Sequence, residues 1–219
     1  MHTQYHTDVG LGSCHAIVGP MFSGKTDMLL RELDRYSRLH GMGVEIFLFK
    51  PKTNTRDKDG NIRAHSGSVR AWSAEIETGM DALLWIDSKV SNRSRIVVVG
   101  IDEAQFVRGL RSFVELALNH RTYVSDYMAN VTMHVYLAAL DGTYKREAWP
   151  EIVAVQPLCH TYRKLTAICS CCGCKEAPFS RRDVASQALE LIGAEESYSA
   201  VCEECFVHPE LRRCCLPSA

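Results

Sequence analysis

A glycine-rich segment near the start of the chain has the residue types and spacing of a phosphate-binding loop. The segment Gly19-Pro20-Met21-Phe22-Ser23-Gly24-Lys25-Thr26 fits the pattern G-x-x-x-x-G-K-[ST] at every fixed position. In such a loop, backbone N–H groups and the positive end of the following helix hold phosphate oxygens, and glycine leaves room for them. The segment therefore predicts an ATP site in which Lys25 reaches the β- and γ-phosphates and Thr26 binds Mg²⁺.

Two adjacent carboxylates, Asp102 and Glu103, follow the most strand-like run of the chain, IVVVGI at 96–101. A phosphate-binding loop needs a second acid at the end of a nearby strand to hold the metal, and Asp102 is placed for that role. Glu103 could accept the proton of an attacking hydroxyl, or it could be a second metal ligand or a surface carboxylate. Because many ATPases share such a pair, the dipeptide alone leaves attack by water open.

Cysteines cluster in the C-terminal part of the chain. Of ten cysteines, six fall within 169–205. Two C-x-x-C pairs could supply the four thiolates of a structural zinc site: Cys169, Cys172, Cys202 and Cys205. Cys171 and Cys174 also satisfy the spacing of the first pair, but Cys169 and Cys172 are preferred because Gly173 can then take the tight turn after the second ligand. A redox or disulfide role is the alternative.

The other cysteines carry no motif. Cys14 and Cys159 stand alone in the sequence, and we expect each to be a small buried apolar residue. Cys214 and Cys215 are not required for a four-ligand site.

The elements that must position these residues alternate along the chain. Short apolar runs predict strands at 14–18, 44–49, 96–102 and 131–140, and apolar residues at helical spacing predict helices at 26–39 and 111–118. The polar stretch at 53–67 predicts a loop. This alternation is typical of the α/β class and indicates a P-loop NTPase-like parallel sheet flanked by helices.

The alternating pattern ends near Leu165. We expect a P-loop ATP-binding α/β domain over 12–165, a small C-terminal zinc-ribbon domain over 166–206, and flexible termini over 1–11 and 207–219.

Composition narrows the class of protein. A formal net charge of −1 and 23% charged residues argue against a polyanion-binding surface, so we expect no nucleic-acid partner. Because no run approaches the roughly 18 apolar residues of a membrane span and the first ten residues lack the features of a signal peptide, we expect a cytoplasmic protein without a membrane partner. The main alternative is a zinc-ribbon P-loop ATPase acting on nucleic acid.

The combination of motifs resembles a known family. GPMFSGKT, GIDEAQF, AALDGTY, KLTAICSCCG and SYSAVCEEC, in this order and spacing, closely resemble the zinc-ribbon (type II) thymidine kinases over residues 12–206. The resemblance implies ATP-dependent phosphorylation of the 5′-hydroxyl of thymidine, and of deoxyuridine, to give dTMP and ADP in deoxynucleotide salvage. It also implies ATP, Mg²⁺ and structural Zn²⁺ as cofactors, a homotetramer, and feedback inhibition by dTTP.

The resemblance also assigns residues, with Glu103 matching the catalytic base of the family. The positions that match ATP-binding residues are Gly19, Pro20, Met21, Phe22, Ser23, Gly24, Lys25, Thr26, Arg56, Asp102 and Gln105. The positions that match nucleoside-binding residues are Met21, Phe106, Leu140, Tyr144, Ser180, Leu189, Leu191, Gly193 and Tyr198. Among these, Tyr144 matches the aromatic that stacks on the pyrimidine and Ser180 lies at the position near the thymine 5-methyl. Leu140 and Leu191 could instead be core residues, and Tyr198 could pack the ribbon.

Some positions depart from the family pattern. Asn54 stands where an aspartate is usual, so a charge is lost two residues before Arg56. Trp149 replaces a smaller aromatic and is expected to pack near the substrate entrance. An extra residue near Cys172 puts the first pair of zinc ligands in doubt.

Overall fold

A parallel β-sheet forms the centre of the computed structural model, which describes residues 11–39, 42–54, 59–64, 66–119, 131–184 and 197–209. Within these residues, six strands pair in the order β5-β2-β6-β7-β1-β8, and every pair is parallel. The strands are β1 Ser13–Gly19, β2 Val44–Pro51, β5 Ala74–Ile76, β6 Ile96–Ile101, β7 Thr132–Leu140 and β8 Thr161–Lys164. The predicted α/β class with a parallel sheet is confirmed.

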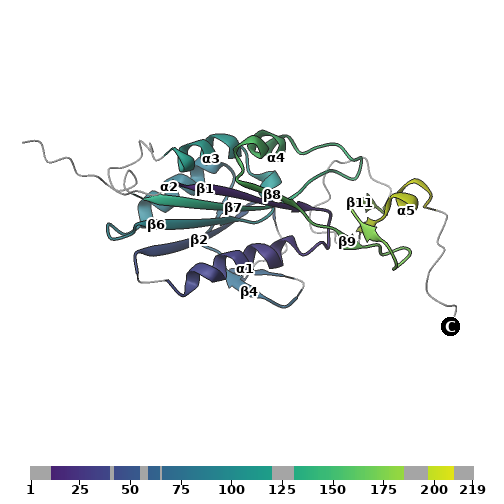
Figure 1. Ribbon diagram of the computed structural model, residues 1–219, viewed down its shortest axis with the longest axis horizontal. Coiled ribbons are helices and arrows are strands. Elements are labelled where there is room, and N and C mark those ends of the chain that lie inside the picture. Colours follow the sequence, from purple (N-terminus) through teal and green to yellow (C-terminus); the bar gives the residue numbers. More distant parts are fainter. Residues whose placement is uncertain are drawn as a thin grey trace, which may run out of the picture.

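Helices cover both faces of this sheet (Figure 1). Helix α1 (Lys25–Ser37) packs on one face, where its buried Leu29, Leu30 and Leu33 belong to the same hydrophobic cluster as Ile17 and Val98. The other face carries α2 (Gly79–Lys89), α3 (Leu110–Leu118) and α4 (Pro150–Val155), which is followed by the 3-10 turn η3 (Gln156–Leu158). None of the described helices has the length and apolar character that crossing a membrane requires.

The carboxyl ends of the parallel strands meet at one edge of the sheet, here called the carboxyl edge. β1 ends there at Gly19 and β7 at Leu140, which lie opposite each other in the strand register. β6 ends at Ile101, opposite Leu137, and leads through Asp102 and Glu103 into the 3-10 turn η1 (Ala104–Phe106). This topology brings the predicted phosphate loop and the predicted acidic pair to the same edge.

A β-hairpin packs beside α1, where the sequence predicted only loop. Strand β3 (Asn61–Arg63) pairs with β4 (Val69–Ala71), and the Ile62 side chain is fully buried in the α1 cluster. Arg70 of β4 also forms an ion pair with Asp34 of α1 at 2.6 Å. The loop prediction over 53–67 is therefore wrong at 61–63, because contacts with a distant helix stabilise a strand too short to be recognised by its pattern.

The C-terminal part of the described chain is a small unit beyond one end of the sheet (Figure 1). β9 (Ala167–Ile168) pairs with β10 (Glu176–Ala177), and β11 (Phe179–Arg182) pairs with β12 (Tyr198–Val201), before helix α5 (Glu203–Val207). We call these elements the ribbon. The expected boundary near Leu165 falls between β8 and β9; whether the two parts are separate domains stays a prediction.

Two histidines lie half-buried on the α1 face of the sheet and share one serine hydroxyl. The Ser13 Oγ atom lies 2.7 Å from His134 Nδ1 and 2.9 Å from His15 Nε2, while His15 Nδ1 lies 2.9 Å from Thr161 Oγ1. Burial lowers the pKa of both histidines below the ordinary value of 6.5, and the nearby His160 adds to this effect by its charge. The folded protein therefore resists protonation of this cluster more than the unfolded chain does.

This cluster predicts that acid weakens the fold. Because the unfolded chain binds protons at these histidines that the folded protein does not, the free energy of unfolding should fall as the pH drops through about 6.5, and level off below the lowered pKa values. Chemical denaturation across this pH range should show that the free energy of unfolding depends less on pH in the double variant His15→Asn/His134→Asn than in the natural chain. The same pH dependence in both proteins would contradict the role assigned to these two histidines.

Candidate active site

The predicted phosphate loop links the end of β1 to the start of α1. Gly24 precedes the helix with a φ of 79°, a left-handed conformation that glycine adopts without strain. At Gly19, a Cβ atom would lie 2.6 Å from the Leu165 carbonyl oxygen, so only glycine fits there. The loop that the sequence predicts thus has the strand–loop–helix setting that phosphate binding needs.

Lys25 lies against this loop. Its side chain is buried, and its Nζ atom donates a hydrogen bond of 2.7 Å to the carbonyl oxygen of Pro20. The Ser23 hydroxyl donates to the same carbonyl at 2.9 Å. The ammonium group is therefore held within the loop whose N–H groups would face the phosphates.

Thr26 and Asp102 meet across the end of the intervening strand β7. The Thr26 hydroxyl donates to the two carboxylate oxygens of Asp102 at 3.1 and 3.2 Å. Burial raises the pKa of Asp102 to about 7, the negative charge of Glu103 acts in the same direction, and the hydrogen bond from Thr26 opposes both. Hydroxyl and carboxylate oxygens are the donors that Mg²⁺ prefers, and a cation here would favour the charged form of the buried acid. The pair therefore fits a magnesium site.

Glu103 is held in an uncommon conformation by its neighbours. Its φ of 50° and ψ of 41° lie in the left-handed region, which a residue other than glycine adopts at some cost in strain. The Gln105 side-chain amide donates to Glu103 Oε2 at 2.5 Å, and its oxygen accepts from the Leu140 N–H at 3.0 Å. Because the Leu140 contact fixes which end of the amide is the oxygen, the NH₂ group of the buried Gln105 must face the carboxylate.

Aromatic side chains lie next to this acidic pair. Phe106 ends η1 and contacts Trp149 edge-to-face, with ring centres 5.3 Å apart. Trp149 is 7% exposed, and in the described part of the chain its Nε1 atom is a buried donor without a hydrogen-bond partner. Leu140 packs against the core cluster that contains Trp149, which supports the alternative core role; its contact with the nucleoside stays a prediction.

The ribbon contacts the phosphate loop through Met21 and Ser180, each of which was predicted to bind the nucleoside. The Met21 N–H donates to the Ser180 hydroxyl of β11 at 2.9 Å. In the ribbon, the Arg182 guanidinium lies 3.9 Å from the centre of the Tyr144 ring and hydrogen-bonds the Tyr198 hydroxyl. The structure thus brings Met21 to Ser180 and, through Arg182, Tyr144 to Tyr198. Arg182 was not among the predicted residues.

Arg146 fixes the segment after β7 to the ribbon. Its guanidinium carbon lies 4.0 Å from the Phe179 ring centre and 3.8 Å from the Phe206 ring centre, and it forms an ion pair with Glu203 at 3.0 Å. Its φ of 62° shows that the backbone turns sharply to make this contact. Tyr144, two residues earlier, is thereby held at the junction of sheet and ribbon.

The predicted cysteines form a cluster in the ribbon. Among the described residues, the Sγ atoms of one group lie within 4.8 Å of one another and all are buried: Cys169, Cys172, Cys202 and Cys205. Cys174 is exposed, and Cys171 accepts a hydrogen bond from Arg181 at 3.3 Å. Four convergent cysteine sulfurs are the donor set of a structural zinc site, so the cluster fits the ion.

Comparison with known proteins decides the family. Residues 12–206 match the family model for thymidine kinase. The chain belongs to the thymidine kinase family. It is 34% identical over 197 residues to the thymidine kinase of sheeppox virus (strain KS-1), covering 89% of this chain and 97% of the relative. The thymidine kinase of raccoon poxvirus is 36% identical over 197 residues, which cover 90% of this chain and 98% of that relative. The cytosolic thymidine kinase of Bos taurus is 31% identical over 195 residues, which cover 89% of this chain and 72% of that relative.

Membership of the thymidine kinase family makes the chain a phosphotransferase. This agrees with the resemblance inferred from the motifs and does not favour the alternative of a nucleic-acid ATPase. Four residues assigned by the resemblance lie outside the described part of the chain: Arg56, Leu189, Leu191 and Gly193.

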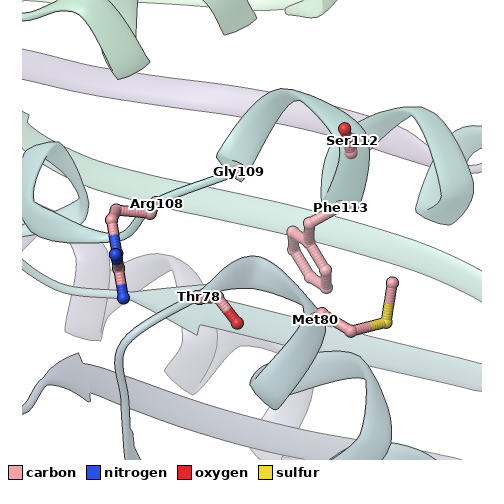
Figure 2. A pocket seen from close by; sticks show the side chains of 6 residues that line it. All are labelled: Thr78, Met80, Arg108, Gly109, Ser112 and Phe113. Atoms are coloured by element: carbon pink, nitrogen blue, oxygen red, sulfur yellow. The ribbon is translucent and has the colours of Figure 1, made fainter.

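A separate hollow opens between the starts of α2 and α3 (Figure 2), with a volume of about 350 Å³. It is lined by Thr78, Met80, Arg108, Gly109, Ser112 and Phe113. The N–H groups at both helix starts are already bonded: those of Glu77 and Thr78 to Asp81, and those of Gly109 and Leu110 to Glu151. None of the lining residues is predicted to bind ATP or a nucleoside in this thymidine kinase family member.

The cysteine cluster predicts the metal content of the protein. Purified protein should contain about one zinc ion per chain, and Cys202→Ser should lose it with a fall in thermal stability, because three thiolates no longer close the site. Elemental analysis and a thermal melt measure both effects. Cys174→Ser is the matched control and should keep the metal; a control that loses zinc, or a Cys202→Ser protein that keeps it, would contradict the ligand set.

Proposed function

We propose that the protein transfers the γ-phosphoryl group of ATP to the 5′-hydroxyl of thymidine, giving dTMP and ADP. The observation that carries this proposal is the position of Glu103 next to the Thr26–Asp102 contact, at the edge where the phosphate loop ends, in a chain of the thymidine kinase family. A carboxylate beside the phosphate site suits transfer to a hydroxyl, since it can accept the hydroxyl proton.

On the phosphate side, the loop N–H groups and the Lys25 ammonium bind the β- and γ-phosphates. Thr26 and Asp102 would hold Mg²⁺, which supplies charge neutralisation for the phosphates when bound. These groups are in place before the substrate arrives: Lys25 is held by Pro20, and Asp102 is held by Thr26. Such preorganised positive charge is the main source of catalysis in phosphoryl transfer.

On the acceptor side, Glu103 takes the proton of the 5′-hydroxyl as the oxygen attacks the phosphorus. Gln105 acts as a positioning residue, because its amide donates to the Glu103 carboxylate while Leu140 fixes the amide orientation. The oriented Glu103 carboxylate can then face the 5′-hydroxyl. The strained backbone of Glu103 fits a residue held for function.

The nucleoside lies between the sheet edge and the ribbon. Tyr144 stacks on the pyrimidine ring, while Arg182 supports the opposite face of Tyr144. Phe106 and Met21 line the same pocket, and Ser180 lies near the 5-methyl group. The buried Nε1–H of Trp149, without a partner in the described ranges, offers a donor to an oxygen of the nucleoside.

Further features follow from the family resemblance and the name of one relative. We propose that deoxyuridine is a second acceptor, that dTTP inhibits the enzyme, and that the chain forms a homotetramer. A cytoplasmic location is proposed because the bovine relative is named cytosolic.

The proposed reaction predicts a simple assay with one decisive variant. Enzyme, Mg²⁺, ATP and thymidine should give dTMP, and Glu103→Gln should lower kcat by about two or more orders of magnitude while KM values stay within a few-fold, because the base is lost and binding is not. Glu176→Gln, an exposed ribbon glutamate, should behave like the natural chain.

Two results would contradict this account. ATP hydrolysis stimulated by single-stranded DNA without dTMP formation would favour the nucleic-acid ATPase. Near-normal turnover of Glu103→Gln with thymidine would remove Glu103 from its role and leave the reaction itself intact.

The role of Gln105 predicts a selective loss of turnover. In Gln105→Leu the Glu103 carboxylate loses the amide that orients it, so kcat should fall while the KM values for ATP and thymidine stay within a few-fold. Gln105→Asn tests whether a shorter amide restores part of kcat. A parallel loss of substrate binding and thermal stability would indicate a merely structural role.

A further inference from the structure

Two cysteines outside the zinc cluster are in contact. Cys14 lies in β1 and Cys159 lies between η3 and β8, and their Sγ atoms are 3.8 Å apart. The expectation of a buried apolar residue is confirmed for Cys14, which lies in the hydrophobic core, and is wrong for Cys159, which is partly exposed. The two side chains also do not stand alone, since they meet in the fold. No local pattern indicates this contact, because 145 positions separate the two residues.

The pairing of β1 with β8 holds these cysteines together. In the parallel register His15 lies opposite Thr161. Just before this pair, the His160 N–H donates to the Cys14 carbonyl at 2.7 Å, and the Cys14 N–H donates to His160 Nδ1 at 3.2 Å. The backbone on both sides is thus fixed, and a disulfide requires an approach of the two sulfur atoms rather than a rearrangement of strands.

The two thiols differ in reactivity. Cys14 is 0% exposed, whereas Cys159 is partly open to solvent. The hydrogen bond between them raises the pKa of the Cys14 thiol, to which burial adds, and lowers the pKa of Cys159. Cys159 is therefore the thiol that a small oxidant reaches first, and Cys14 is the buried partner behind it.

We propose that Cys14 and Cys159 are a redox-active dithiol that peroxides convert to a disulfide. With hydrogen peroxide, the Cys159 thiolate attacks one peroxide oxygen, becomes a sulfenic acid and releases hydroxide, which takes up a proton. The Cys14 sulfur then attacks the Cys159 sulfur; the S–S bond forms, the S–O bond breaks, and the hydroxyl leaves with the Cys14 proton as water. The two thiols lose two electrons, and the peroxide is reduced to two water molecules.

This modification site is independent of the kinase chemistry. Neither cysteine belongs to the residues predicted for ATP, nucleoside or zinc, although β1 leads directly into the phosphate loop. The disulfide would tie β1 to the segment that follows α4 and η3. Glutathione would reverse it by thiol–disulfide exchange.

The test uses the zinc-loaded, full-length protein after removal of reductant. Limited hydrogen peroxide should produce a tryptic species that joins the Cys14 peptide to the Cys159 peptide, about two hydrogen masses lighter than their sum, and glutathione should remove it. Zinc should stay bound, as measured with a colorimetric chelator. Zinc release before the link appears, or oxidation without any link between these peptides, would overturn the proposal.

The single variants sharpen the test because they should behave differently. In Cys14→Ala the sulfenic acid at Cys159 has no partner and should be trapped by dimedone, whereas in Cys159→Ser the buried Cys14 should stay unlabelled. Cys174→Ser, which lacks an exposed cysteine outside the pair, should form the link as the natural chain does. Equal labelling of Cys14 and Cys159 in the two variants would contradict the assigned roles.

Discussion

The contact between the Thr26 hydroxyl and the Asp102 carboxylate is the interaction on which the active site depends. It joins the first turn of α1, which follows β1 and the phosphate loop, to the end of β6 across β7, which lies between β1 and β6 in the sheet. Its partners stay in reach because β1 and β6 are each registered against β7. A slip of one residue in either pairing would turn the side chains of a strand to the opposite face and separate the metal-binding oxygens. The parallel sheet therefore fixes the phosphate chemistry.

The ribbon supplies the second half of the site through a few contacts. Ser180 hydrogen-bonds the phosphate loop at Met21, and Arg146 and Arg182 connect the segment after β7 to the ribbon by stacking on aromatic rings. Since β9 to β12 are very short, the cysteine cluster is the part of the ribbon that can hold these contacts in place. Zinc would then affect acceptor binding without touching the nucleoside.

The sequence predicted the elements whose pattern is local and missed those that depend on distant partners. The phosphate loop and the strand at 96–101 are recognisable from spacing and unbroken apolar character. Helix α2 was not predicted, although Thr78 and Asp81 form a capping box that marks its start. The burial of Ile62, the bridge from Glu103 through Gln105 to β7 and the meeting of Cys14 with Cys159 arise only when remote segments pack. No local pattern encodes them.

A double-mutant cycle on Mg-ATP binding tests whether Thr26 and Asp102 act on one metal ion. Thr26→Val, Asp102→Asn and the double variant would be compared with the natural chain by isothermal titration calorimetry. We expect a loss of affinity in each single variant and a combined loss smaller than their sum, with a coupling energy of about 0.5–3 kcal/mol. Strictly additive losses, or undiminished binding in either single variant, would contradict this expectation.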